Sequence, residues 1–175
     1  MKKIKLTWFI LSVLAISCEQ EEQSTVSKQR DIHQEDWSKR AANISETDSL
    51  IFGKTYLSVY SEMYSFSQKQ KYSLTGMISL RNVSETDTIY LLRADYYDTA
   101  GSRIRGYFKS PVYLRPMETV EIVIAHKDIE GGTGSNFLFE WKTPPNCPEP
   151  LFEGVMNSMQ GSKGVAFVTQ GKRTK

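Results

Sequence analysis

From Thr55 onward, hydrophobic and polar residues alternate in short runs, and turn residues separate one run from the next. One such run extends over residues 72–81 and another over residues 117–126. A period of two is typical of a β-strand that buries one face and exposes the other. The pattern therefore predicts a chain built mainly from half-buried strands.

The ends of these runs predict how the strands connect. The runs at residues 88–97 and 103–108 flank Asp98 and Gly101, which favour a tight turn, so they predict a hairpin. A second hairpin is expected across the glycine-bearing turn at residues 160–164. The pattern gives about eight strands and no convincing helix among them. We expect an all-β fold, a single antiparallel β-sandwich of the immunoglobulin-like kind. A closed β-barrel is the alternative, because periodicity does not distinguish the two.

The first eighteen residues have a different pattern, with three lysines followed by an apolar run from Leu6 to Ile16. As a helix, this run covers about 16 Å, roughly half of a hydrocarbon core, and this length suits a signal peptide. Residues 15–18, Ala-Ile-Ser-Cys, resemble a lipobox, in which the cysteine accepts a lipid and becomes the first residue after cleavage. We therefore predict a bacterial signal peptide at residues 1–17 and lipidation of Cys18. This anchor places the protein in the cell envelope, at the outer membrane, in a periplasmic or surface-facing orientation.

The segment between the cysteine and the first strand is expected to be a tether. Residues 19–47 are rich in Glu, Gln, Ser and Lys and have few apolar side chains to bury. Within them, residues 37–44 have the spacing of a short helix. The expected domains are the lipidated cysteine and tether at residues 18–54, a β-sandwich at residues 55–171 and a basic tail at residues 172–175.

The net charge of the chain argues against one class of binding partner. The chain has 22 basic and 20 acidic residues, and the predicted cleavage removes three lysines and no acidic residue, so the formal charge changes from +2 to −1. A near-neutral mature chain lacks the basic surface that nucleic acids require. We therefore expect no nucleic-acid partner, and the chain length suits one domain.

The best candidate site is a glycine-rich stretch between two apolar runs. It combines two carboxylates, three glycines and an amide, at Asp128, Glu130, Gly131, Gly132, Gly134 and Asn136. Glycines let backbone N–H groups approach an anion, whereas carboxylates and carbonyl oxygens are the ligands that Ca²⁺ prefers. The simpler alternative is that the three glycines occupy positive-φ positions of a long connection between strands.

Catalysis has little support in the sequence. The two histidines, His33 and His126, lie in the tether and at the end of a strand, and neither has a nucleophile or a second metal ligand at a suitable spacing. Cys147 lies in a proline-rich loop with no basic neighbour that would activate its thiol. We predict no catalytic residues, no metal site and no cofactor.

Tyrosines give a second candidate site. Tyr56, Tyr60 and Tyr64 recur at even spacing in the first expected strand, on the face opposite its aliphatic side chains. If the aliphatic face is buried, the tyrosines face outward and offer rings and hydroxyls to a sugar or a protein. Packing between side chains of neighbouring strands explains the same tyrosines without a ligand.

Three tripeptides of Asp, then Ser or Thr, then an aliphatic or small residue resemble the acceptor sites of a bacterial O-glycosylation system. Their hydroxyl residues are Ser49, Thr88 and Thr99. Ser49 lies nearest the tether and is the most accessible of the three, whereas the other two also fit the chemistry of turns.

Five sequence blocks follow one another along the second part of the chain: SLTGMISLRN, DYYDTAG, SPVYLRPMETVE, GGTGSNF and GVMNS. In order and spacing they resemble the bacterial domain-of-unknown-function family 3124 over residues 56–171. The resemblance implies an exported β-sandwich and no assigned activity. The family's first strand carries a proline and a histidine where this chain has Ser58 and Glu62, so a role built on that histidine does not carry over.

These inferences favour a lipid-anchored cell-envelope protein whose molecular function the sequence does not name. We expect a non-catalytic binding or adaptor module that meets an envelope protein or a glycan, and that meets the membrane through its lipid. Two alternatives remain open: a metal- or anion-dependent enzyme centred on the loop at residues 130–136, and a passive structural lipoprotein.

Overall fold

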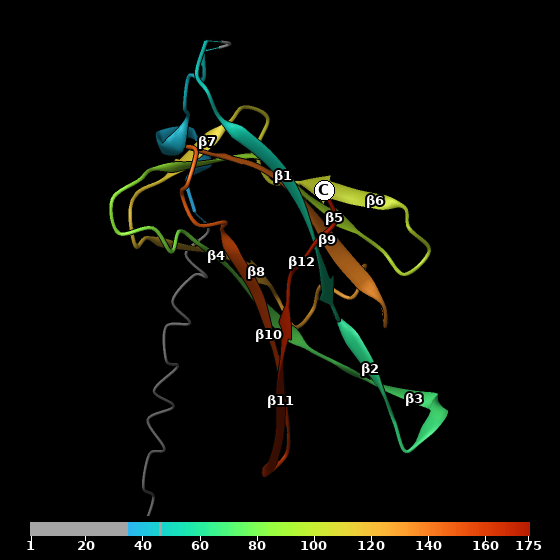
Figure 1. Cartoon of the computed structure of the whole chain (residues 1–175). Helices are drawn as coiled ribbons and strands as arrows, with labels where there is room; N and C mark the ends of the chain where they lie inside the picture. The colour runs from blue at the N-terminus through green and yellow to red at the C-terminus, as the bar shows by residue number, and fades with distance from the viewer. Residues whose placement is uncertain (1–34, 46) are drawn as a thin grey trace, which may run out of the picture. The chain divides into compact units, whose positions relative to one another are not determined.

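The computed structural model describes residues 35–45 and 47–175 (Figure 1). Within them the chain forms one short 3-10 helix and twelve β-strands. The bounds of these elements are η1 (Trp37–Arg40), β1 (Ile51–Val59), β2 (Glu62–Ser65), β3 (Ser67–Ser73), β4 (Thr75–Arg81), β5 (Ile89–Tyr97), β6 (Arg103–Gly106), β7 (Val112–Leu114), β8 (Thr119–Ile124), β9 (Ser135–Thr143), β10 (Leu151–Gln160), β11 (Lys163–Gln170) and β12 (Lys172–Arg173). The predicted signal peptide, Cys18 and His33 lie outside the described residues. Inside them, no helix has the length and apolar character needed to cross a membrane.

The strands form two main antiparallel sheets that pack face to face. One sheet has six strands in the order β12-β1-β9-β5-β6, with β7 also paired to β5, and the other has four in the order β11-β10-β4-β8. The separate hairpin β2–β3 projects from one end (Figure 1). The sheets do not close into a barrel. The prediction of an all-β antiparallel sandwich is therefore confirmed, and the barrel alternative is wrong.

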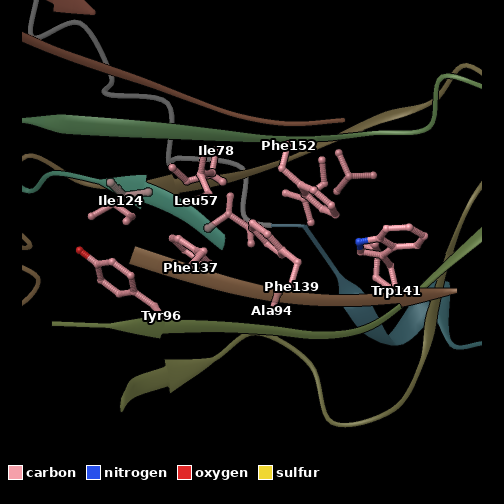
Figure 2. Packing of buried hydrophobic residues seen from close by; sticks show 14 of the residues in the cluster. Leu57, Ile78, Ala94, Tyr96, Ile124, Phe137, Phe139, Trp141 and Phe152 are labelled. Carbon is pink, nitrogen blue, oxygen red and sulfur yellow. The ribbon is translucent and has the colours of Figure 1, made fainter. Parts of the chain in front are cut away.

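Alternate side chains of the two sheets meet between them and form the core (Figure 2). On β9, Phe137, Phe139 and Trp141 are buried, whereas the residues between them lie on the other face and are half-buried. Phe139 stacks on Phe152 of the opposite sheet, with ring centroids 4.2 Å apart and an interplanar angle of 6°. Aromatic rings bury much apolar area, so this stack holds the two sheets together through some of their largest side chains.

The ring of Trp141 needs a glycine on the neighbouring strand. Gly53 on β1 lies opposite Trp141 on β9, and a Cβ atom at Gly53 would overlap the indole ring. The indole N–H donates to the buried hydroxyl of Thr55 at 3.0 Å. The close approach of the ring and the satisfied N–H group together explain why this large side chain is fully buried here.

The number of strands is higher than expected because the first long run divides. The alternation over residues 54–64 predicts one strand, but β1 ends at Val59 and β2 begins at Glu62. The N–H groups of Ser61 and Glu62 both donate to the carbonyl of Gly132 at 3.1 Å, and the chain leaves the sheet there. The strands β7 and β12 are three and two residues long, too short for alternation to reveal them.

The sandwich begins earlier in the chain than expected. Strand β1 starts at Ile51, inside the tether predicted at residues 18–54. Ahead of it, the guanidinium of Arg40 donates to Glu118 at 3.0 Å and so attaches the polar segment to the sandwich. The helix expected over residues 37–44 is a single 3-10 turn that ends at Arg40. The polar composition of this segment predicts a tether, because composition contains no information on ion pairs with residues far away in the sequence.

The C-terminal residues also belong to the sheet. Residues 172–175, expected as a basic tail, are exposed, but Lys172 and Arg173 form β12, which pairs with β1. The amide of Thr174 donates to the carbonyl of Lys54 at 2.9 Å. The guanidinium of Arg173 lies 5.4 Å from the ring centroid of Trp141. Backbone pairing and cation–π attraction hold this exposed segment against the sheet.

Candidate functional site

The carboxylates of the glycine-rich loop are both bound to one arginine. Asp128 and Glu130 follow β8, and Arg105 on β6 donates to both, with 3.1 Å between Arg105 Nη1 and Glu130 Oε2. The side chain of Asp128 is 22% exposed and that of Glu130 is 64% exposed, so the contact with Asp128 is the less solvated one. The described part of the chain has no group of three His, Cys, Asp or Glu side chains that would hold a metal ion. The two carboxylates fasten the loop to β6.

The three glycines of this loop have different surroundings. Gly132 has a φ of 72°, but Gly131 and Gly134 have ordinary φ values, so the expectation that all three occupy positive-φ positions is wrong for those two. A Cβ atom at Gly131 would overlap the hydroxyl of Tyr96. The hydroxyl of Thr99 donates to the Gly131 carbonyl at 2.9 Å and accepts from the Gly134 amide at 2.9 Å. One threonine therefore closes the loop against the turn that follows β5.

Asn136 does not join this loop. It lies within β9, opposite Ser58 of β1 and Tyr97 of β5. The structure therefore brings Asp128 and Glu130 together at one arginine and leaves the amide of the candidate set on the sheet.

The three candidate tyrosines do not share one strand face. Tyr56 is 39% exposed on β1, and Tyr64 is 53% exposed on β2. Tyr60 lies between these strands, with its ring centroid 5.7 Å from that of Phe167. Because the chain leaves the sheet after Val59, even spacing in the sequence does not place the three rings on one surface. Their role in binding stays a prediction.

The three predicted glycosylation positions differ in access. Ser49 is exposed just before β1, and Thr88 is half-buried just before β5. Thr99 is exposed, but its hydroxyl makes both of the loop contacts described above. Glycosylation stays a prediction, and Ser49 is the position that fits it best.

A groove of about 240 Å³ lies beside Arg105, between β6 on one sheet and β8 on the other. Its lining residues come from three segments far apart in the sequence, namely Glu35, Trp37, Arg105, Gly106, Tyr107, Glu121, Ile122 and Val123. Sequence reasoning missed this groove, because nothing local in the chain connects η1, β6 and β8.

Arg105 is a permanent cation in this groove. Its guanidinium lies 5.2 Å from the ring centroid of Tyr96 and 5.9 Å from that of Tyr107. Burial acts to lower the pKa of Arg105, but hydrogen bonds and charge interactions with Tyr107 and Asp128 outweigh burial and raise it. Burial raises the pKa of Tyr107, so its hydroxyl stays protonated at neutral pH.

The other end of the groove is formed by the segment before β1. The ring of Trp37 packs against Phe108 with centroids 5.1 Å apart, and Arg40 donates to Glu35 at 2.6 Å. These contacts fix an aromatic ring and a carboxylate at the groove. The lining therefore combines two aromatic side chains, two carboxylates and a cation, a set that recognises ligands through stacking, hydrogen bonds and charge.

Strand β8 forms a regular edge beside the groove. It pairs with β4 over six consecutive residue pairs without a register shift. Along the described chain, no strand pairs with its other edge. The inward side chains of Val120, Ile122 and Ile124 are buried and apolar. Natural edge strands are often protected by a bulge, a proline or an inward charge, and β8 has none of these.

A row of apolar side chains crosses the outer face of the four-stranded sheet and ends at this edge. Val155 of β10 lies between Val168 of β11 and Met77 of β4. Met77 in turn lies opposite Val123 of β8. Val168 is 58% exposed, and the other three side chains are half-buried. The row stops at Val123, next to the groove.

Together, the fold and the site define a β-sandwich protein with a mixed aromatic and charged groove beside a sheet edge that is unpaired within the described residues. The family described as "Protein of unknown function (DUF3124)" matches residues 53–174, so the chain belongs to this family and the predicted resemblance is confirmed. The chain is also similar to the structure described as "Crystal Structure of Thermotoga maritima 1070", with a TM-score of 0.42 and 10% sequence identity over 69% of this chain and 92% of that chain. No curated protein matches the sequence.

Proposed function

We propose that this chain is a lipid-anchored protein of the cell envelope that acts as a non-catalytic binding module, and that it binds an extended segment of a partner protein along β8. The regular edge of β8, unpaired within the described residues and beside the groove, is the observation that carries the proposal. The anchor is supported by the lysines, the short apolar run and Cys18 at the start of the chain.

A partner segment in extended conformation fits this edge because alternate N–H and C=O groups of an edge strand point away from its sheet. Alternate side chains of the added strand point to its two faces. One set extends the apolar row beyond Val123, and the other enters the groove beside Trp37 and Tyr107. Backbone pairing supplies affinity and the side-chain contacts supply specificity, so the ligand is a segment with apolar residues at alternate positions.

The side chains of the groove favour binding over catalysis. The lining residues include no serine, cysteine or histidine, which are the usual nucleophiles and bases. Asp128 and Glu130, the carboxylates nearest to the glycines, are hydrogen-bonded to Arg105. An enzyme centred on residues 130–136 therefore has less support than a binding module. A passive structural role gives no reason for an apolar row on a solvent-facing sheet surface.

A photo-crosslinking residue at position 121 tests this proposal in cells that make the full-length protein. Glu121 is exposed on β8, and Gln170, exposed on the opposite edge strand β11, is the matched control position. We expect a discrete adduct from position 121 that position 170 does not give. Mass spectrometry of the adduct identifies the cross-linked segment. A synthetic peptide of that segment should protect the amides of β8 from hydrogen exchange.

A pair of substitutions shows whether the peptide lies along β8. Val123→Glu places a charge where the apolar row meets the edge and should weaken peptide binding by about tenfold, which corresponds to about 1.4 kcal/mol. Val168→Glu places the same charge at the far end of the row and should leave binding unchanged. The thermal unfolding of both variants is measured first, so that a misfolded protein is recognised. Equal weakening by both substitutions, or protection of amides outside β8, contradicts strand addition.

A further inference from the structure

One side chain at the tip of a hairpin stands almost entirely in solvent. Phe66 alone separates β2 from β3, and it is 94% exposed. Its φ is 53°, in the left-handed region that side chains with a Cβ rarely adopt. A large aromatic residue in this position gains nothing from burial in the fold and is held in a strained backbone conformation.

Among the described residues, this conformation occurs at glycines and also at Met117, with a φ of 58°, and Asn146, with a φ of 64°. Gly101, after β5, has a φ of 83°, and Gly161, between β10 and β11, has a φ of 60°. Glycine adopts such values without cost, whereas another residue pays about 1–2 kcal/mol. Phenylalanine at position 66 therefore costs stability, and an exposed ring that costs stability points to a contact outside the chain.

A second hairpin projects from the same end of the sandwich. Strand β4 begins at Thr75 opposite Asn157, and β10 continues beyond that pair to Gln160 before β11 returns. Met159 on this extension is 69% exposed. Figure 1 shows the β2–β3 and β10–β11 hairpins extending beyond the sheets at one end of the molecule. Each hairpin thus presents an apolar side chain at the same end.

The charge near the tips of these two hairpins is positive. Residues 63–73 and 157–166 contain three lysines, Lys69, Lys71 and Lys163, and no Asp or Glu. Glu62, the first residue of β2, lies at the base of its hairpin and forms an ion pair with Lys71 at 3.1 Å. The remaining residues of the two segments are mainly serine, glutamine and glycine. The tips therefore combine isolated apolar side chains with positive charge.

We propose that this end of the sandwich docks onto an anionic phospholipid surface. In this arrangement Phe66 and Met159 enter the boundary between headgroups and acyl chains, and the lysines lie beside the phosphates. A lysine near an anionic bilayer contributes about 1 kcal/mol, and buried apolar area adds to it. The contact uses a different part of the molecule from β8, so it does not depend on the proposed strand addition there.

A lipid surface fits these tips better than a protein partner does. A stable protein interface needs about 800 Å² of continuous, complementary surface from each partner. The exposed side chains here stand on two narrow hairpins with polar neighbours. A bilayer accepts such separate side chains, because each one inserts independently and the phosphates surround the lysines.

The predicted anchor is compatible with this orientation. Glu35, the first described residue, lies seventeen positions after Cys18, and that length of chain reaches at most about 60 Å. The ten residues of β10 extend over about 33 Å. The tether is therefore long enough for the lipid and the hairpin tips to reach the same membrane.

The experiment uses full-length protein in vesicles of phosphatidylcholine, with or without phosphatidylglycerol. An environment-sensitive fluorophore is attached at Ser67→Cys, next to the exposed ring, in a Cys147→Ser background. The control position is Glu85→Cys, because Glu85 is exposed beyond the opposite end of β4. We expect the label at position 67 to be quenched by nitroxide groups on the lipid chains when phosphatidylglycerol is present, and the label at position 85 to remain in water. The Cys147→Ser protein without an added cysteine gives the contribution of Cys18.

Phe66→Gly separates membrane contact from folding, because glycine fits the backbone and removes the ring. We expect its unfolding transition to be kept or raised, and the quenching at position 67 to fall about fivefold. Lys69→Gln should reduce the dependence on phosphatidylglycerol. Equal exposure of positions 67 and 85 to water in anionic vesicles overturns the proposal. Unchanged quenching in Phe66→Gly, or shielding of position 67 that requires another protein, also overturns it.

Discussion

The three glycines in the loop after β8 are required for different physical reasons, or are not required at all. Gly132 has a φ of 72°, which costs a residue with a Cβ about 1–2 kcal/mol. Gly131 has an ordinary φ but is buried against the hydroxyl of Tyr96. Gly134 has neither constraint, because an added Cβ would lie 3.4 Å from the nearest atom of Thr99. The spacing of the glycines in the sequence does not distinguish these three cases.

Alanine substitutions should separate the three glycines by their effect on the free energy of unfolding. Gly131→Ala should cost about 2–3 kcal/mol because Tyr96 and its neighbours must move. Gly132→Ala should cost about 1–2 kcal/mol through backbone strain, and Gly134→Ala should change stability by less than about 0.5 kcal/mol. Urea unfolding of the three variants measures the order. A Gly134→Ala variant as unstable as Gly131→Ala contradicts this account.

At the scale of strands and hairpins, the sequence predicts structure wherever the constraint is local. Strands β5 and β6 and the turn at Gly101 follow from alternation and turn residues that are close together in the chain. The end of β1 does not, because the hydroxyl and amide of Ser61 bind the carbonyl of Gly132, 71 positions away. Because the sequence does not reveal this contact, the alternation predicts one continuous strand where the structure has β1 and β2.

The groove and the apolar row lie beyond sequence reasoning for a related reason. The row exists because the register of four strands places Val168, Val155, Met77 and Val123 side by side. A single sequence contains no information on register between strands that are far apart. One signal was available, since Val123 is an apolar residue on the outward face of an alternating strand. The sequence singles out the two loop carboxylates, but it does not reveal their arginine partner on β6.

A buried carboxylate joins β5 to β6. The side chain of Asp95 is 6% exposed and accepts from Arg103 Nη2 at 2.9 Å, and Arg93 donates to it as well. Burial acts to raise the pKa of Asp95, but hydrogen bonds from Arg103 and Arg93 outweigh burial and lower it. Because the folded state lowers this pKa, the carboxylate contributes stability above the unfolded pKa of about 3.9, and this contribution is lost as the pH falls through the folded pKa.

Asp95→Asn should therefore destabilise the protein in a pH-dependent way. At pH 7 we expect a loss of about 2 kcal/mol, since the arginines that remain are partly solvated. Below about pH 4 the difference between the wild type and the variant should shrink, because the wild-type carboxyl group also becomes neutral. Chemical unfolding at several pH values measures this difference, with Glu85→Gln at an exposed position as control. A difference that stays constant down to pH 2 contradicts the role assigned to the carboxylate.

At the scale of the whole molecule, the two proposed contacts use separate surfaces. The edge of β8 runs along the side of the sandwich, whereas Phe66 and Met159 lie on hairpins at one end. Docking of that end onto a membrane leaves the side with β8 accessible to a partner segment. In the proposed arrangement, the module holds its partner segment close to the bilayer, and the predicted lipid anchor keeps the module at the membrane when the hairpin contact opens.

The predicted lipid anchor gives the last prediction. Cys18 follows a short apolar run, and both lipid attachment and cleavage are expected to depend on its thiol. Cys18→Ser should therefore lack the mass of the lipid, and the protein should be either released from membranes or retained as an uncleaved precursor. Cys147→Ser, which changes the other cysteine, should keep the added mass of the lipid and the wild-type fractionation. Mass spectrometry and membrane fractionation check both variants. The membranes are washed with high salt first, because salt weakens the attraction between lysines and phosphates and so removes the contribution of the hairpin tips. If Cys18→Ser has unchanged mass, processing and fractionation, the protein is not a lipoprotein.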